Sequence, residues 1–103
     1  MKLKAKKKEL QSGDVRLTFE GDVTIYTVVK LRKLLMKELK KVPGIELDLS
    51  KIGKFDTAGF QLFLHMKKLA SSENKNVFIG KMSDTVARVF DLYGVNMRGN
   101  ETT

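Results

Sequence analysis

The sequence predicts a single α/β domain in which a mixed or parallel sheet of about four strands carries three helices. Segments of alternating apolar and polar residues indicate half-buried strands, and a short continuous apolar run indicates another strand. Between them lie stretches whose apolar residues recur three and four positions apart, as on one side of a helix. Strands that alternate with helices need crossover connections, which favour parallel pairing.

The two ends of the chain are expected to differ from its middle. Residues 1–10 are rich in lysine, and we expect them to be either frayed or an edge strand, where lysine side chains oppose aggregation. The folded domain is predicted to span residues 11–97. Residues 98–103 are mostly polar and are predicted to form a disordered tail.

The first half of the domain is predicted to form one strand and one long helix. Residues 15–20 alternate apolar and polar side chains, which indicates a strand that ends at Gly21. Residues 24–42 have helical spacing up to Pro43, which does not continue a helix. The side of this helix that we expect to be buried comprises Ile25, Val28, Leu35, Leu39 and Val42, widened by Val29 and Met36.

A second strand and helix are expected next. Residues 45–49 form a half-buried strand, followed by a tight turn around Gly53 and a helix over residues 57–72. This helix starts with apolar residues around most of its circumference. The pattern predicts either burial against the sheet and neighbouring helices or a partner-binding patch that includes Phe60 and Leu64.

The last expected elements are a short strand and a third helix. Residues 77–79 are continuously apolar, which is typical of a central strand covered on both faces. Ser83 or Asp84 supplies the cap of the following helix. Gly94 is the expected end of that helix.

Positive charge is concentrated in the first two-fifths of the chain. Residues 1–41 carry 12 Lys+Arg against 5 Asp+Glu, whereas residues 42–103 carry 8 against 7. The sequence has no cysteine and no apolar run approaching the ~18 residues of a membrane span. No apolar segment follows the basic start, so no signal peptide is indicated. These properties together predict a cytoplasmic protein without disulfides.

Five lysines share one face of the helix predicted over residues 24–42. They are Lys30, Lys33, Lys37, Lys40 and Lys41. Such a run is commonly a solvated face, and its functional alternative is a docking surface for an acidic partner. Aromatic residues do not interleave with these lysines, which argues against nucleic-acid binding.

The most informative motif lies where the second helix begins. Asp56 or Thr57 supplies a side-chain oxygen at this helix start, the usual position of a capping residue. The amides and the dipole at a helix N-terminus also favour a negatively charged group such as phosphate. The spacing of the residues alone therefore leaves both a capping role and a phosphate-bearing role open.

The sequence Asp56-Thr57-Ala58-Gly59, preceded by an Asp-Leu-Ser strand and followed by an apolar helix, resembles the Asp-Ser-Ser-Gly signature of the STAS domain. This family is named after sulfate transporters and anti-sigma-factor antagonists. The resemblance covers about residues 15–97 and includes the order of the predicted strands and helices. Typical members continue into a further strand and helix, which are not expected here.

The resemblance implies a non-enzymatic regulator that binds other proteins and is switched by phosphorylation. In the family the hydroxyl residue after the Asp is the phosphorylation site, a position held here by Thr57. The implied partners are a serine/threonine kinase of the anti-sigma-factor type and a phosphatase, and a dimer is compatible with the resemblance. The expected partner-binding residues are Asp56, Thr57, Ala58, Gly59, Phe60, Gln61, Leu64 and Thr24.

Two departures from the family signature leave alternatives open. Ala58 replaces the second hydroxyl, and Thr24 replaces an acidic residue near the phosphorylation site. An Asp-Thr pair before small residues also resembles the STAS subunit of the bacterial phospholipid-transport ABC complex, which implies an ABC ATPase subunit as partner. Residues 24–27 resemble STAS proteins associated with bacterial chemotaxis and signalling kinases, which is a third alternative.

Enzymatic chemistry by this chain alone is not expected. His65 is the only histidine, and without a cysteine or second histidine it indicates no metal site. Thr57 and His65 lie eight residues apart on one predicted helix, about 12 Å of rise, which is too far for a nucleophile–base pair. Glycine-rich phosphate loops are absent, so we expect neither a catalytic residue nor a cofactor.

Overall fold

The computed structural model describes residues 3–95, which form four strands and three helices. The strands are β1 (Leu3–Glu9), β2 (Val15–Val23), β3 (Gly44–Phe55) and β4 (Asn76–Met82). The helices are α1 (Val28–Leu39), α2 (Thr57–Ser72) and α3 (Asp84–Tyr93). The sequence-based prediction of an α/β fold with a mixed sheet and three helices is confirmed. The tail predicted over residues 98–103 lies outside the described residues.

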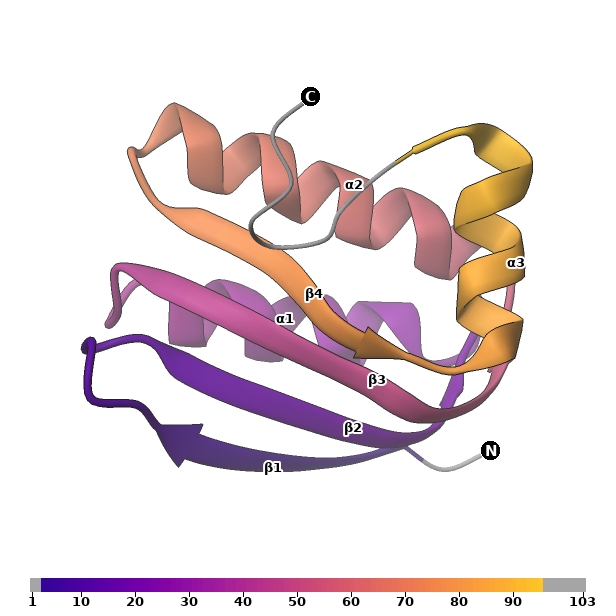
Figure 1. The fold of residues 1–103 in the computed structure, drawn as a ribbon, viewed down its shortest axis with the longest axis horizontal. Coiled ribbons are helices and arrows are strands. Elements are labelled where there is room, and N and C mark those ends of the chain that lie inside the picture. Colours follow the sequence, from indigo (N-terminus) through magenta and orange to yellow (C-terminus); the bar gives the residue numbers. More distant parts are fainter. Residues whose placement is uncertain (1–2, 96–103) are drawn as a thin grey trace.

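The sheet has the order β1-β2-β3-β4 and is covered by helices on one face (Figure 1). β1 is antiparallel to β2, whereas β2, β3 and β4 are mutually parallel neighbours. α1 and α2 lie behind the sheet in this view, and α3 packs at the end of the sheet where α2 begins. The core between sheet and helices includes the fully buried side chains Leu17, Phe19, Leu47, Leu49 and Phe63.

Among the described residues, Leu3–Glu9 forms an edge strand, which was one of the two alternatives predicted for residues 1–10. β1 pairs with β2 over its whole length, from Leu3 opposite Gly21 to Glu9 opposite Val15. Its lysines are exposed, as expected for an edge that must not pair with other chains. Lys7 also forms a 3.4 Å ion pair with Glu38 of α1, which ties the edge strand to the helix layer.

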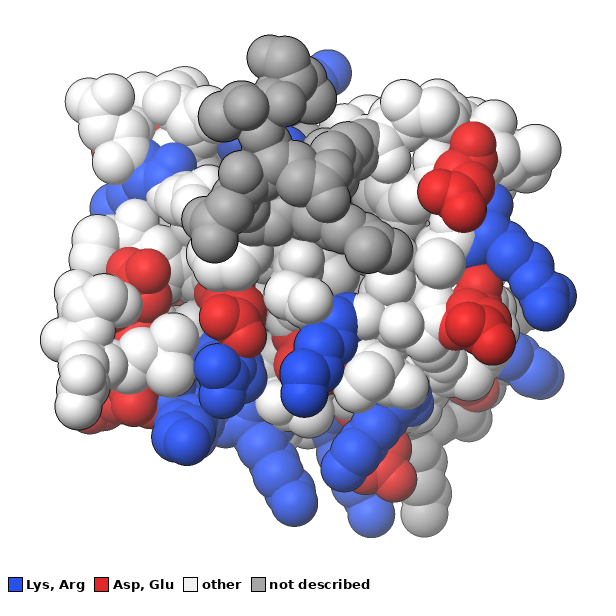
Figure 2. Space-filling view, viewed as in Figure 1, with Lys and Arg blue, Asp and Glu red and all other residues white. Residues whose placement is uncertain are grey.

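The opposite face of the sheet is polar and carries charges of both signs over β1 to β3 (Figure 2). Arg16 Nε donates to Glu46 Oε2 at 2.5 Å, and this hydrogen bond with the accompanying charge attraction raises the pKa of Arg16. At Asp48, desolvation raises the pKa, but hydrogen bonds from the hydroxyl and amide of Ser50, together with nearby positive charges, outweigh it and leave the pKa lowered.

The first helix is shorter than predicted, because residues 24–27 form a turn before it. In this turn the Thr24 amide donates to Thr27 Oγ1 at 3.0 Å, and the Tyr26 amide donates to Thr24 Oγ1 at 3.3 Å. Threonine hydroxyls that bond nearby backbone groups compete with the helical hydrogen-bond pattern. The helix therefore begins at Val28 and ends at Leu39, where Lys75 Nζ donates to the terminal carbonyl.

The predicted strand end at Gly21 and the predicted tight turn around Gly53 are both wrong. β2 and β3 stay paired beyond these glycines, with Gly21 opposite Ile52 and Val23 opposite Phe55. The φ angle of 127° at Gly21 and the register shifts beside it bend β2 without ending it. The longer strands place the start of α2 directly beside the turn that follows β2.

The prediction of a central strand at residues 77–79 is also wrong. Within residues 3–95, β4 pairs only with β3 and is therefore an edge strand. Val77 and Ile79 are buried in the core, whereas Phe78 is half-buried on the other face, opposite Glu46. A continuous apolar run does not distinguish an edge strand from a central one when a large residue also lies on its outer face.

The remaining helix boundaries agree with the sequence. α2 spans Thr57–Ser72, as predicted. The Ser83 hydroxyl, one of two predicted caps, accepts a 3.3 Å hydrogen bond from the Val86 amide at the start of α3. Gly94 ends this helix with a φ of 66°, in the left-handed region where glycine is favoured.

Candidate functional site

The carboxylate of Asp56 accepts hydrogen bonds from two segments at the end of the sheet where α1 and α2 begin. Asp56 is the N-cap of α2, and its Oδ1 accepts a 3.1 Å hydrogen bond from the Gly59 amide. Its Oδ2 accepts a 2.9 Å hydrogen bond from the amide of Ile25, in the turn before α1. Asp56 therefore both caps α2 and holds the neighbouring turn against it.

Thr57 is the first residue of α2, and its side chain is exposed. Because Asp56 provides the cap, the Thr57 hydroxyl is not needed for capping. Among the described residues it forms no hydrogen bond. The amides of Thr57 and Ala58 have no acceptor within the helix, as is general for a first turn. The open choice between Asp56 and Thr57 as the cap is thus settled in favour of Asp56.

Gly59 sets how closely the first turn of α2 approaches the sheet. A Cβ atom at this position would lie 2.8 Å from Val23 Cγ1 and 3.0 Å from both Phe55 Cε1 and the Val23 carbonyl oxygen. Two of these three neighbours belong to packed side chains of β2 and β3, and the third is rigid backbone. Only a residue without a Cβ lets the helix start sit here, so Gly59 determines where Thr57 is presented.

The turn over residues 24–27 displays apolar side chains next to this helix start. Thr27 Oγ1 donates to the Asp22 carbonyl at 2.9 Å, and Thr27 itself is buried together with Thr24. Ile25 and Tyr26 consequently point outward, with exposed fractions of 65% and 81%. Ile25 was predicted to be buried, and its exposure is a correction that follows from the turn.

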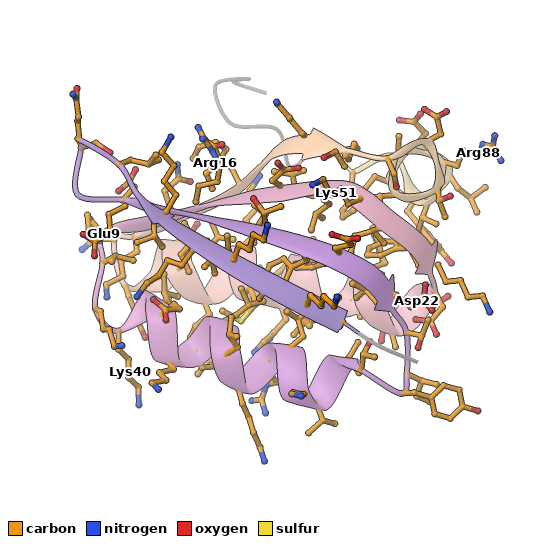
Figure 3. All side chains as sticks on the ribbon, turned by 90° about the horizontal axis from the view of Figure 1, so that it is seen from below. Glu9, Arg16, Asp22, Lys40, Lys51 and Arg88 are labelled. Atoms are coloured by element: carbon orange, nitrogen blue, oxygen red, sulfur yellow. The ribbon has the colours of Figure 1, made fainter. Side chains whose placement is uncertain are left out.

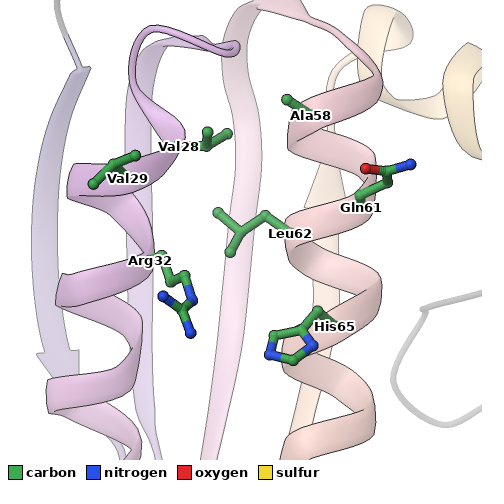
Figure 4. A pocket seen from close by; sticks show the side chains of 7 residues that line it. All are labelled: Val28, Val29, Arg32, Ala58, Gln61, Leu62 and His65. Atoms are coloured by element: carbon green, nitrogen blue, oxygen red, sulfur yellow. The ribbon is translucent and has the colours of Figure 1, made fainter.

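A shallow groove of about 330 Å³ runs between α1 and α2 (Figure 4). α1 contributes Val28, Val29 and Arg32 to it, and α2 contributes Ala58, Gln61, Leu62 and His65. Val29, predicted to widen the buried side of the helix, is 65% exposed at the rim of this groove. The groove is apolar near the helix starts, and Arg32 and His65 lie further along it on facing helices.

The predicted partner-binding residues divide into exposed, half-buried and buried groups. Thr57 and Gln61 are exposed, whereas Asp56, Ala58 and Leu64 are half-buried. The buried group consists of Thr24, Gly59 and Phe60.

The residues of the buried group pack beneath the surface and hold the exposed residues in place. Phe60 stacks on Tyr93 with ring centroids 4.5 Å apart and contacts Phe90 at 5.1 Å, so burial, and not a surface patch, describes this residue. Thr24 holds the turn described above. Tyr26 was not among the site residues predicted from the sequence, although the Thr-x-x-Thr spacing was a signal for a turn that would expose the residues between.

The five lysines of the predicted basic face are all exposed on α1 or just after it. Figure 3 shows Lys40 pointing away from the sheet. Within residues 3–95 none of the five forms an ion pair, since the two ion pairs there involve other cations. A role in docking stays a prediction for Lys30, Lys33, Lys37, Lys40 and Lys41.

The described part of the chain shows no group of three residues arranged to hold a metal ion. His65 is exposed on α2 and lines the groove without a second histidine near it. None of the three helices there has the length and apolar character required to cross a bilayer.

Comparison with known proteins gives consistent matches over most of the chain. The sequence model of the family described as "Mlab, STAS domain" matches residues 7–97. An anti-sigma-B factor antagonist of Staphylococcus epidermidis is 28% identical over 86 residues, covering 81% of this chain and 80% of that protein. The intermembrane phospholipid transport system binding protein MlaB of Escherichia coli (strain K12) is 29% identical over 86 residues, covering 84% of this chain and 86% of MlaB.

A solved structure supports the same fold. The anti-sigma factor antagonist SpoIIAA in its unphosphorylated form superposes with a TM-score of 0.77, covering 96% of this chain and 89% of that one. Its sequence identity is 17%, so this comparison concerns the fold alone.

Proposed function

This chain belongs to the STAS domain family, and from that premise we propose that it is a protein-binding regulator switched by phosphorylation of Thr57. The proposed partner is a serine/threonine kinase of the anti-sigma-factor type, with a phosphatase that reverses the modification. Its proposed location is the cytoplasm. The relationship to an anti-sigma-B factor antagonist supports this class of partner.

The observation that carries the proposal is the state of the Thr57 side chain. It is exposed at the start of α2, and its hydroxyl forms no hydrogen bond within residues 3–95, because Asp56 already caps the helix. A phosphate adds roughly −1.5 to −2 charge at pH 7, and a helix N-terminus stabilises negative charge. Modification of Thr57 should therefore leave the fold intact.

The same phosphate should prevent a partner from binding this surface. Ile25, Tyr26 and Val29 place exposed apolar side chains close to the start of α2. A partner that packs on them and on an unmodified Thr57 excludes water from that region. A phosphate there would be buried without a counter-charge, and Asp56 beside it adds like-charge repulsion.

The test uses capture of the tagged full-length chain from its native cells, with mass spectrometry of both the captured proteins and the Thr57 peptide. We expect a kinase of the stated class among the captured proteins. We expect phosphate on Thr57 in the part of the tagged chain that is recovered without this kinase. Thr57→Glu should bind this kinase much more weakly, by about 3–5 kcal/mol, while its thermal unfolding barely shifts. Thr85→Glu is the matched control, because it places the same charge in the first turn of α3.

Either of two results would contradict the proposal. One is phosphate found at other residues while Thr57→Ala is still fully modified. The other is a Thr57→Glu variant that unfolds readily or binds the kinase as well as the parent chain, since Thr57 would then have a structural role only.

A second candidate function is that of a small accessory subunit of a bacterial phospholipid-type ABC transporter. The observation that favours it is the relationship to MlaB, of which this chain covers 86%. In this case the surface around Thr57 would contact an ABC ATPase subunit without accepting phosphate. The capture experiment separates the two candidates, because it returns an ABC ATPase and an unmodified Thr57 peptide for the second.

A further inference from the structure

We propose that the groove between α1 and α2 binds an acidic amphipathic helix of the partner protein. The inference rests on the proposed function in one respect, because it assumes that the partner covers the surface beside Thr57. It adds the chemistry and the conformation of the segment that binds there.

The shape and the lining residues of the groove favour a bound segment that has a ridge of apolar side chains. Val28, Ala58 and Leu62 form its apolar part, and Leu62 reaches from α2 toward α1 (Figure 4). Val29 is exposed within the groove, and Ile25 and Tyr26 in the preceding turn extend the apolar surface beyond it. Leucine-sized side chains that repeat every three or four residues on one face of a helix match such a surface.

The groove selects a helix over an extended segment because its walls are two helices. Away from the helix ends, their backbone donors and acceptors are used within α1 and α2, so the groove offers no sheet edge to an extended chain. A helix satisfies its own backbone hydrogen bonds and needs only side-chain contacts. An extended segment would bring unpaired amides and carbonyls into an apolar groove, which is unfavourable.

The charge around the groove selects an acidic segment. Arg32 and His65 lie on facing helices along the groove, and Lys33 and Lys37 are exposed on the adjacent outer side of α1. The cations Arg32, Lys33 and Lys37 form no ion pair within the described part of the chain. A helix with leucines on one face and glutamates on its flanks would place carboxylates beside them.

Other occupants fit less well. A second copy of this chain would bring a second row of α1 lysines toward the first, at a net charge of +8 per chain. A membrane surface is flat and would contact the lysines without filling the groove. Nucleic acid fits less well because the groove lining includes no Phe, Tyr or Trp side chain on which bases could stack.

The position of Thr57 connects this groove to the switch. Thr57 immediately precedes Ala58, one of the groove's lining residues, and its side chain is exposed. A phosphate there would repel the glutamates of a bound helix. The switch would therefore act by repulsion of a negatively charged partner as well as by desolvation.

The test uses amide NMR of the full chain titrated with a synthetic helical peptide of about 18 residues, long enough to be helical in isolation. The peptide carries leucines on one face and glutamates on both flanks, and a second peptide replaces every glutamate by lysine. We expect the acidic peptide to bind with a Kd of about 1 mM or tighter, with shifts centred on Val29, Ala58 and Gln61. The basic peptide should not bind.

Two variants and a control sharpen the result. Arg32→Glu should weaken binding roughly tenfold, and Thr57→Glu should weaken it in the same direction. Arg88→Glu makes the same charge change on the exposed face of α3 and should have no effect. Changing Lys33, Lys37 and Lys40 to Gln should flatten the salt dependence of binding.

The inference is overturned by equal binding of both peptides, by no binding, or by shifts that lie only along the lysines and leave the groove unperturbed. Shifts in the groove on addition of phosphatidylglycerol vesicles, or on raising the concentration of the chain alone, would also overturn it in favour of a membrane or a second copy. None of these results affects the capture of a partner or the mapping of phosphate to Thr57. The proposed function therefore stands or falls separately.

Discussion

α1 and α2 begin side by side at one end of the sheet, yet their starts are built in different ways. α2 has an acidic side-chain cap and a glycine pressed against the sheet, so its first turn is tightly held. Thr27, the N-cap of α1, makes no side-chain capping hydrogen bond to its helix, and the turn before it displays Ile25 and Tyr26. The start of α2 is therefore held in a fixed position against the sheet, whereas the turn before α1 presents an exposed apolar surface.

The two starts are nevertheless linked by a hydrogen bond. Asp56 Oδ2 accepts from the Ile25 amide across 31 positions of sequence. The comparison therefore predicts that damage to the α2 start will spread to the exposed turn, whereas changes to the exposed side chains will not spread back. Four substitutions test this, from the largest expected effect on stability to the smallest.

Gly59→Val should have the largest effect. A Cβ there collides with Val23 and Phe55, and a β-branched side chain has few rotamers with which to avoid them. We expect the free energy of unfolding to fall by about 1–3 kcal/mol, and partner binding to fall with it. Urea denaturation measures the change in the free energy of unfolding.

Gly53→Val is the matched control for that substitution. It lies in β3, and a Cβ there meets only ordinary contacts, the nearest being Asp22 Oδ1 at 3.4 Å. A β-branched residue suits a strand, so stability should be unchanged or slightly increased. Equal stability of the two valine variants would mean that α2 is not held by close approach to the sheet.

Asp56→Ala should have the next largest effect, because it removes both the α2 cap and the bond to the Ile25 amide. The expected loss is about 0.5–2 kcal/mol in the free energy of unfolding. Hydrogen exchange at the Ile25 amide should accelerate beyond what this global loss explains. Asp56→Asn, which keeps a capping oxygen, should recover most of the stability. Unchanged local exchange at Ile25 in the alanine variant would show that the two helix starts are independent.

Thr27→Val should destabilise the α1 start alone. It removes the hydroxyl that donates to the Asp22 carbonyl and accepts from the Thr24 amide, at a loss of about 1 kcal/mol. Thr27→Ser keeps the hydroxyl and serves as the control. Amide exchange should rise in residues 24–27 and stay unchanged in the first turn of α2. Acceleration at Gly59 as well would contradict the predicted direction of coupling.

Tyr26→Ser should change stability least, within about 0.5 kcal/mol, because the ring is 81% exposed. Binding of the partner identified by capture should nevertheless weaken, measured by titration calorimetry. Leu92→Ser removes a side chain that is 78% exposed on α3 and should alter neither stability nor binding. Equal binding by the Tyr26 and Leu92 variants would remove the turn from the proposed partner surface.

Local signals predicted α2 and α3 better than α1 and the strands. The capping residues Asp56 and Ser83 lie at helix starts in both the sequence and the structure, because capping depends on neighbours a few positions away. The start of α1 was misplaced, since helical spacing of Ile25 and Val29 also occurs in a threonine-stabilised turn. Gly21 and Gly53 suggested strand ends, but pairing with the neighbouring strand carried β2 and β3 past them.

The sequence by itself determined the order of strands and helices from residue 15 onward, the helix that starts at Thr57, and the lysine face of α1. Each of these features depends on the spacing of residues within one segment, which can be read directly from the sequence. Only the tertiary structure decided that Asp56 and not Thr57 is the cap and holds Ile25. It also decided that Phe60 is buried under Phe90 and Tyr93. These outcomes depend on which distant segment covers a given face, and burial is a property of that contact and not of the residue alone.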